Sequence, residues 1–171
     1  MKFFFSFLIS FFLFTGSNFA DESIRFININ YIVNNSDAGV SLNKIIKNKT
    51  KKIESELKDL AKKIEEKKNK IVSQKNIIKK EEFNKLVKDY EKEVEIFNEL
   101  RNKKKADFDS FRVESKKKIL DLLNPIITDF LQSNSIKILL QKEKIIFGDD
   151  NLDITEKILR IFNDKHKKIK F

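Results

Sequence analysis

The sequence predicts an α+β protein in which a long antiparallel α-helical hairpin, resembling a coiled coil, forms an arm on a small β-sheet body with a C-terminal helix. Three observations support this fold class. Apolar residues recur at steps of four and three through residues 41–132, with charged residues between them. This pattern loses its phase near residues 73–76, and strand-like segments flank it at both ends. Two phased series with a break between them are typical of a helical hairpin.

Residues 1–20 have the pattern of a secretory signal peptide. Lys2 supplies a positive charge, residues 3–14 are mostly apolar, and a small polar stretch ends at Ala20. The apolar run is shorter than the ~20 residues of a membrane-spanning helix, which disfavours an uncleaved anchor. We therefore expect export and cleavage after Ala20.

The charge of the chain is concentrated in its middle. The whole sequence carries a formal net charge of +10 at pH 7, and residues 47–105 alone contain 20 basic and 12 acidic side chains. The chain is rich in Lys, Asn, Ile and Phe, as are proteins from AT-rich genomes, so compositional drift remains an alternative explanation for the lysines. The sequence has no cysteine, so packing, oligomerisation or both must stabilise the protein without disulfides.

Residues 21–40 are predicted to form the first part of the body. Residues 23–30 are short and rich in Ile and Phe, which predicts a strand. One helical turn could follow over residues 31–35. Residues 34–39 then hold the densest turn signal of the chain and end in Gly39.

Residues 41–120 are predicted to form the arm, with its tip near residues 73–80. Its apolar seam is narrow, as in two helices that bury a stripe against each other. A continuous rod of ~90 residues is the alternative, since neither Gly nor Pro marks the tip. Strands at both ends favour the hairpin. The seam comprises Leu42, Ile46, Lys49, Ile53, Leu57, Leu60, Ile64, Lys67 and Ile71, then Phe83, Val87, Tyr90, Val94, Phe97, Lys104, Phe108, Phe111, Ile119, Leu122, Ile126 and Phe130.

Residues 121–171 are predicted to complete the body. Pro125, the only proline, should kink the second long helix where it enters the body. Residues 136–140 and 144–147 are predicted strands. Residues 153–156 form a variant of the capping box that opens a helix.

The charged tail, residues 163–171, is expected to fray. A single copy of this body buries little apolar surface, so subunit association is expected. The predicted body and oligomer core comprises Phe26, Ile27, Ile29, Ile138, Leu140, Ile145 and Phe147.

No residues suited to catalysis or to holding a cofactor or metal emerge from the sequence. The only histidine, His166, lies in the lysine-rich tail, and cysteine is absent. Residues 149–153 lack the spacing and the terminal glutamate of an EF-hand loop, so a turn with a helix cap is favoured. The sequence therefore predicts a protein that is not an enzyme.

The order of these parts resembles the Skp/OmpH family of periplasmic chaperones over essentially the whole mature chain. The resemblance rests on the strand Ile24–Ile29, the segment ending in Gly39, the charged hairpin, and the stretch Leu122–Ile126. The two later strands and the closing helix that begins with Asp153-Ile154-Thr155 complete it. The lysine content and the lack of a glycine at the tip depart from the family.

The resemblance implies a homotrimer in the periplasm whose arms enclose a cavity and hold unfolded outer-membrane β-barrel proteins without ATP. Residues near the arm tip are the candidate client contacts, although packing of the hairpin turn is an equally good explanation for them: Ile71, Val72, Ile77, Ile78 and Phe83. Lysines of the arm form the candidate basic surface: Lys62, Lys63, Lys67, Lys68, Lys79 and Lys80.

Two other functions remain as alternatives, a coiled-coil spacer of the envelope and a basic protein that binds lipid or nucleic acid. Anionic phospholipid or lipopolysaccharide suits lysines interleaved with Ile and Phe. Nucleic acid is disfavoured, because a secreted protein meets little of it and the chain has only four arginines.

Overall fold

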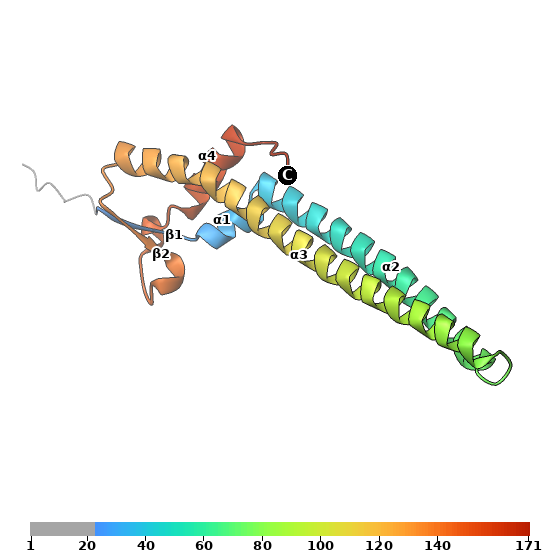
Figure 1. Cartoon of the computed structure of the whole chain (residues 1–171). Coiled ribbons are helices and arrows are strands. Elements are labelled where there is room, and N and C mark those ends of the chain that lie inside the picture. The colour runs from blue at the N-terminus through green and yellow to red at the C-terminus, as the bar shows by residue number, and fades with distance from the viewer. Residues whose placement is uncertain (1–22) are drawn as a thin grey trace, which may run out of the picture.

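A computed structural model describes residues 23–171. A long helical hairpin projects from a small body that contains both strands and two further helices (Figure 1). The predicted signal peptide, residues 1–20, lies outside the described residues. Within residues 23–171, no helix combines the length and the apolar character that crossing a membrane requires.

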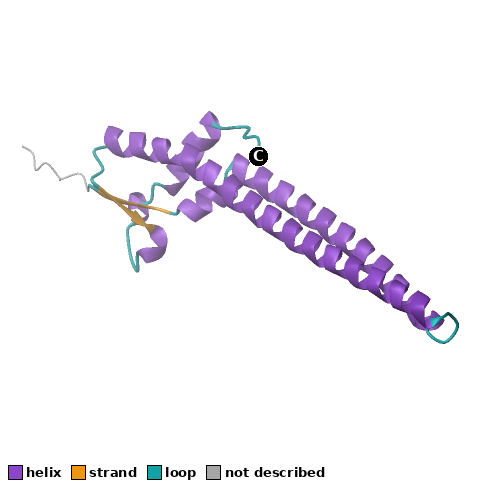
Figure 2. Cartoon of the chain, viewed as in Figure 1, coloured by secondary structure: helices purple, strands orange, loops and turns teal. Residues whose placement is uncertain are grey.

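The described chain is mostly helical, with a two-stranded sheet (Figure 2). Two short 3-10 turns, η1 and η2, connect the second strand to the last helix. In chain order the elements are β1 (Ile24–Ile27), α1 (Ile29–Asn35), α2 (Asp37–Gln74), α3 (Lys80–Ser133), β2 (Ile138–Gln141), η1 (Lys142–Lys144), η2 (Asp150–Leu152) and α4 (Thr155–Lys165).

Local capping explains where the first helices begin. The Asn28 side chain accepts a hydrogen bond from the Tyr31 backbone N–H at 2.7 Å and opens α1. The Ser36 hydroxyl accepts from the Gly39 N–H at 3.1 Å and opens α2. The short helical turn predicted for residues 31–35 is thus a seven-residue helix, and the predicted break is a single capping residue between two helices.

The arm is a hairpin, so the continuous rod is excluded. Helix α2 has 38 residues, α3 has 54, and the residues between them form the turn at the predicted tip. Apolar seam positions are half-buried along most of the arm, and they are buried at Ile71 near the tip and at the base, where Leu42 and Ile119 join the core. The extra length of α3 lies against the body and packs on α4.

Helix α3 continues through Pro125 to Ser133. Figure 1 shows that the last turns of α3, drawn in orange, run in a different direction from its arm portion. Proline lacks the N–H that would bond one turn back, which favours bending at this point. Leu123, Ile126 and Ile127 are buried here, so the helix enters the body where the sequence predicts.

The two strands are parallel, with Ile24 opposite Ile138 and Phe26 opposite Leu140. The hairpin arm is the long connection that parallel strands require. On its other edge, β1 is held by the start of α4, since the Phe26 carbonyl accepts from the Ile154 N–H at 3.0 Å. Strand β1 is therefore central, and β2 has no second partner strand within residues 23–171.

One face of this sheet packs on the helices. Ile27 belongs to the core cluster, and Leu139 packs against that cluster. Because side chains alternate along a strand, the opposite face carries Ile24, Phe26, Ile138 and Leu140. The core comprises Ile27, Ile32, Val33, Ala38, Leu42, Ile119, Leu123, Ile126, Ile127, Ile154, Ile158, Leu159 and Phe162.

The predicted third strand, residues 144–147, is wrong. The chain turns through η1 instead, and Lys142 forms an ion pair with Asp153 at 2.5 Å. The following loop then crosses the Phe26 ring, against which Gly148 lies. The backbone at the start of α4 occupies the edge of β1 that faces away from β2, so the loop cannot pair with β1 there.

The prediction of a frayed C-terminal tail is also wrong. Ile169 and Phe171 pack against the core cluster. The Lys118 ammonium of α3 donates a hydrogen bond to the Lys170 carbonyl at 2.7 Å. Contact of these two apolar side chains with the core holds the charged tail against the body.

Candidate functional site

The arm tip divides the predicted client-contact residues into two groups. Val72 is 62% exposed and Ile77 is 79% exposed, whereas Ile71 is only 7% exposed and closes the seam. Ile78 and Phe83 are half-buried. Val72 and Ile77 are therefore the members of this set with substantial apolar surface available to another molecule.

The predicted basic surface is also divided. Five of its six lysines are exposed, and Lys62 makes only a loose pair with Glu66 on the same helix, at 3.9 Å. Lys67 is the exception, because it lies in the seam and pairs with Glu93 of α3 at 2.5 Å. Lys67 is still partly exposed, but its charge is paired within the arm, since the helix periodicity that puts it in the seam also turns its ammonium toward the opposite helix.

Three lysines occupy seam positions, and each faces the opposite helix. Besides Lys67, the Lys104 ammonium contacts the Glu56 carboxylate at 2.7 Å. The hydrogen bond from Lys104 and its positive charge hold the pKa of Glu56 below its usual range. The Lys49 ammonium lies 4.6 Å from the centre of the Phe111 ring, a cation–π contact.

The seam periodicity in the sequence predicts the positions of these lysines but not their acidic partners. Glu56 and Glu93 lie beside the apolar stripe rather than on it, so the apolar pattern alone does not select them. Their positions relative to the tip would have identified them, because residues equally far along the chain from the tip lie opposite each other in an antiparallel hairpin. The three pairs across the seam, 49 with 111, 56 with 104 and 67 with 93, are all centred on residue 80.

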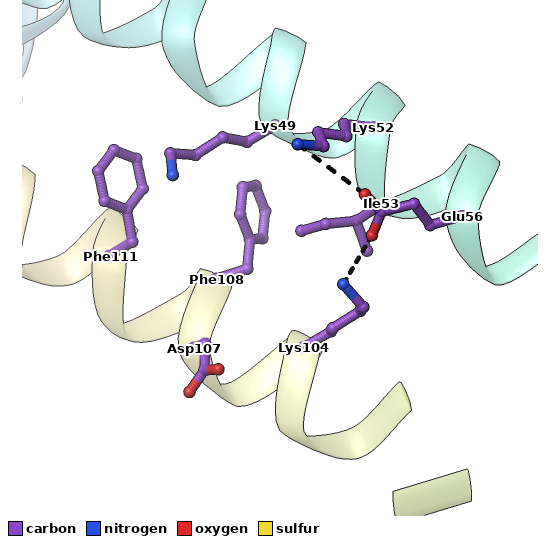
Figure 3. A pocket seen from close by; sticks show the side chains of 8 residues that line it. All are labelled: Lys49, Lys52, Ile53, Glu56, Lys104, Asp107, Phe108 and Phe111. Carbon is purple, nitrogen blue, oxygen red and sulfur yellow. Dashed lines mark hydrogen bonds and ion pairs between the residues drawn. The ribbon is translucent and has the colours of Figure 1, made fainter. Parts of the chain in front are cut away.

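The seam is loosely packed around these lysines. A gap of about 280 Å³ lies between α2 and α3. Figure 3 shows Phe108 and Ile53 pointing into it from opposite helices. A second gap of about 240 Å³ follows toward the tip and is mostly apolar. The first gap is lined by Lys49, Lys52, Ile53, Glu56, Lys104, Asp107, Phe108 and Phe111.

The outer face of the body sheet is apolar and incompletely covered. Of its side chains, Phe26 is buried under the loop after β2, while Ile24, Ile138 and Leu140 are exposed. Of the other predicted core residues, Ile27 is buried, and Ile29 and Ile145 are half-buried. Ile146 and Phe147, next to this face along the chain, are fully exposed. Ile138, Leu140 and Phe147 thus lie outside the core of a single chain, and their predicted place in an oligomer core stays a prediction.

The predicted cap of the last helix is a polar junction that ties three segments together. The Asp153 carboxylate accepts hydrogen bonds from Lys142 and from the Thr155 backbone N–H, and the Thr155 hydroxyl accepts from the Asn28 N–H at 2.8 Å. Partial burial alone would raise the pKa of Asp153, but the bonds from Lys142 and Thr155 hold it below its usual range. The carboxylate is therefore charged at neutral pH and joins η1 to the start of α4, while Thr155 joins α4 to Asn28, the residue after β1.

Among residues 23–171, no cluster of three or more His, Cys, Asp or Glu side chains is arranged to bind a metal ion. The notable features of the described chain are instead an open arm with an imperfect seam, an exposed apolar tip and an apolar sheet face.

Comparison with known proteins identifies the family. The sequence model of the family described as outer membrane protein (OmpH-like) matches residues 23–162. The chain belongs to the OmpH-like family. The match runs from β1 into α4, so it covers the arm and nearly all of the body.

The OmpH-like fold is also found among solved structures. The crystal structure of a proposed outer membrane chaperone (OmpH-like) from Caulobacter crescentus CB15 superimposes with a TM-score of 0.81 at 14% sequence identity. The match covers 93% of this chain and 95% of that chain. At this identity the likeness establishes the OmpH-like fold alone. A search of curated proteins finds no match.

Proposed function

We propose that this protein is an ATP-independent holdase chaperone of the periplasm that binds unfolded outer-membrane β-barrel proteins and prevents their aggregation. Membership of the OmpH-like family is the observation that carries this proposal. The structural neighbour from Caulobacter crescentus CB15, itself proposed to be an outer membrane chaperone, supports the same role.

The arm has properties that suit a holdase. An unfolded barrel protein exposes apolar strand faces and unpaired strand edges, and so it aggregates. Val72 and Ile77 offer apolar contacts among exposed lysines, which favour weak binding to acidic clients. Polar pairs in the seam also favour an arm that adapts its shape, because such contacts hold helices together less firmly than continuous apolar packing.

We further propose that three copies associate through their bodies, so that the arms surround a shared cavity. The exposed outer face of the sheet supports association, because Ile138, Leu140 and Phe147 would otherwise remain in water. The second edge of β2 also presents backbone groups that strand pairing with another copy would satisfy.

Anionic phospholipid or lipopolysaccharide is an additional candidate partner for the lysines of the arm.

The direct test is light scattering. A denatured outer-membrane barrel protein is diluted out of urea at physiological salt, without nucleotide, with and without the purified residues 21–171. We expect near-stoichiometric amounts of the chain to keep scattering low. An equal amount of a highly helical protein of similar charge is the control for unspecific electrostatic protection.

If scattering rises as fast as in buffer while circular dichroism shows a folded helical protein, the holdase proposal fails. A coiled-coil spacer would then become the leading function. Binding to vesicles or nucleic acid that disappears at high salt, without any protection of clients, would instead favour a basic surface binder.

A further inference from the structure

The three seam lysines differ in one respect. Lys67 and Lys104 each contact a glutamate of the opposite helix, at 2.5 and 2.7 Å. Lys49 faces Phe111 at the equivalent place, and no carboxylate of residues 23–171 forms an ion pair with it. Its ammonium group therefore lies beside an aromatic ring in the arm without a negative charge to match it.

The gap beside Lys49 combines apolar walls with excess positive charge. Figure 3 shows Lys49, Lys52 and Lys104 around the gap. Glu56 accepts a hydrogen bond from Lys104 at 2.7 Å and forms a loose ion pair with Lys52 at 4.0 Å. The Asp107 carboxylate points away from the other labelled side chains (Figure 3). Three cations and two anions thus line the gap, so its net charge is positive.

We propose that this gap of about 280 Å³ binds an aromatic side chain that stands beside a carboxylate in an unfolded polypeptide. The aromatic ring enters between Ile53, Phe108 and Phe111, and the carboxylate pairs with the ammonium of Lys49. The inference rests on the proposed function, since an unfolded client is the source of such segments, and it identifies the class of segment that the arm selects.

The chemistry of the gap favours this occupant over a purely apolar or a purely charged one. Phe108 and Phe111 are half-buried, so an added ring gains aromatic contacts and leaves water. A carboxylate near Lys49 meets a cation that the arm does not neutralise. An acidic group alone would lack the apolar contact, and a ring alone would leave Lys49 unpaired.

The test uses small probes and needs no client. N-acetyl-L-phenylalanine, which has both a ring and a carboxylate, is titrated into the ¹⁵N-labelled chain of residues 21–171 while backbone amide shifts are followed. Its amide, N-acetyl-L-phenylalanine amide, is the uncharged probe, and N-acetylglycine is the probe without a ring. We expect shifts confined to residues 47–57 and 103–112, with binding weakened roughly two- to fivefold for the uncharged probe and no saturable shift for N-acetylglycine.

Variants separate the site from general lysine effects. Lys49→Gln removes the unmatched charge at an exposed position, so the variant should fold and bind both phenylalanine probes equally. Lys62→Gln is the matched control, because Lys62 is exposed on the same helix but lies outside the gap. It should retain the preference for the charged probe.

Three results would overturn the inference. The first is an absence of localised shifts with N-acetyl-L-phenylalanine. The second is a preference for its carboxylate that persists in Lys49→Gln. The third is that only dihexanoyl phosphatidylglycerol, below its micelle concentration, shifts these amides, which would assign the gap to lipid headgroups. If the chain prevents aggregation of the barrel protein but does not bind the probe, the proposed site in the gap is refuted and the holdase function is not. If the chain binds the probe but does not prevent aggregation, the holdase function is refuted and the binding site is not.

Discussion

Gly39 shows how closely α1 and α2 approach. A Cβ atom at this position would lie 1.9 Å from the Val33 carbonyl oxygen, far inside van der Waals contact. The clash is with backbone, which cannot move aside as the end of a flexible side chain can. Glycine is therefore required by space here, and its φ angle is not in the left-handed region.

Gly39→Ala is expected to destabilise the protein by about 1–3 kcal/mol or more, because the first turn of α2 must move away from α1. Urea unfolding followed by circular dichroism measures the free energy of unfolding. Ser41→Ala, at an exposed position two residues later, is the control and should change little. Equal stability of Gly39→Ala and the natural protein would contradict the packing described for the two helices.

Asp153 is expected to make the stability of the body depend on pH. The pKa of its carboxyl group is lower in the folded chain than in the unfolded one, so its contribution is present above about pH 4 and is lost as the pH falls through the lowered value. Asp153→Asn should cost about 1.5 kcal/mol at pH 7. The difference between the variant and the natural protein should shrink toward pH 2 in thermal unfolding, and a difference independent of pH would contradict this role.

At the scale of the helices, the arm is held by apolar residues interrupted by charge. Partly exposed ion pairs contribute little to stability, and replacement of even a buried ion pair by well-packed apolar residues is often neutral or stabilising. The double variant Lys67→Ile, Lys104→Ile is therefore expected to stabilise the arm by about 1 kcal/mol or more. Glu56 and Glu93 retain enough exposure to be solvated after the change.

Amide hydrogen exchange of the arm measures this effect, with slower exchange expected in both helices. Lys62→Ile, which adds an apolar side chain outside the seam, is the control and should leave exchange unchanged. Faster exchange in the double variant would show that the ion pairs contribute more than apolar packing would.

The tip of the hairpin is expected to contribute to client binding. Val72→Ser with Ile77→Ser removes the two most accessible apolar side chains near the turn, so the concentration that halves light scattering should rise several-fold. Both side chains are exposed, so helix content should be unchanged. Val113→Ser, at a comparably exposed position near the arm base, is the control, and an equal effect there would refute a special role of the tip.

At the scale of the whole molecule, a single chain leaves apolar surface on the body exposed. Ile146→Asp with Phe147→Asp is expected to weaken subunit association, because each change places a charge where apolar contact is proposed. The measurement is molar mass by light scattering after size exclusion over a range of concentrations.

The folded single chain should survive these changes, since neither side chain contributes to its core. Val40→Asp, at the exposed start of α2, is the control. An unchanged molar mass for the double variant, with retained helix content, would exclude this loop from the subunit contact.

The sequence by itself determined the elements whose signal is local and periodic. The seam steps of four and three predicted both long helices, the loss of phase predicted the turn, and the order of segments predicted the OmpH-like family, which the family match confirms. Asp153 and its neighbours predicted the start of α4 to within one residue. Such features depend on residues within a few turns of one another, so they can be deduced without the fold.

Only the tertiary structure decided which distant groups meet. It paired Lys67 with Glu93 and Lys104 with Glu56, and it left Lys49 facing a ring. In the fold, the start of α4 occupies the free edge of β1, and residues 144–147 form a loop rather than a strand. The charged tail also packs onto the core. The physical reason is that such contacts join segments far apart in the chain, where competition for one strand edge or one apolar surface has no local signature.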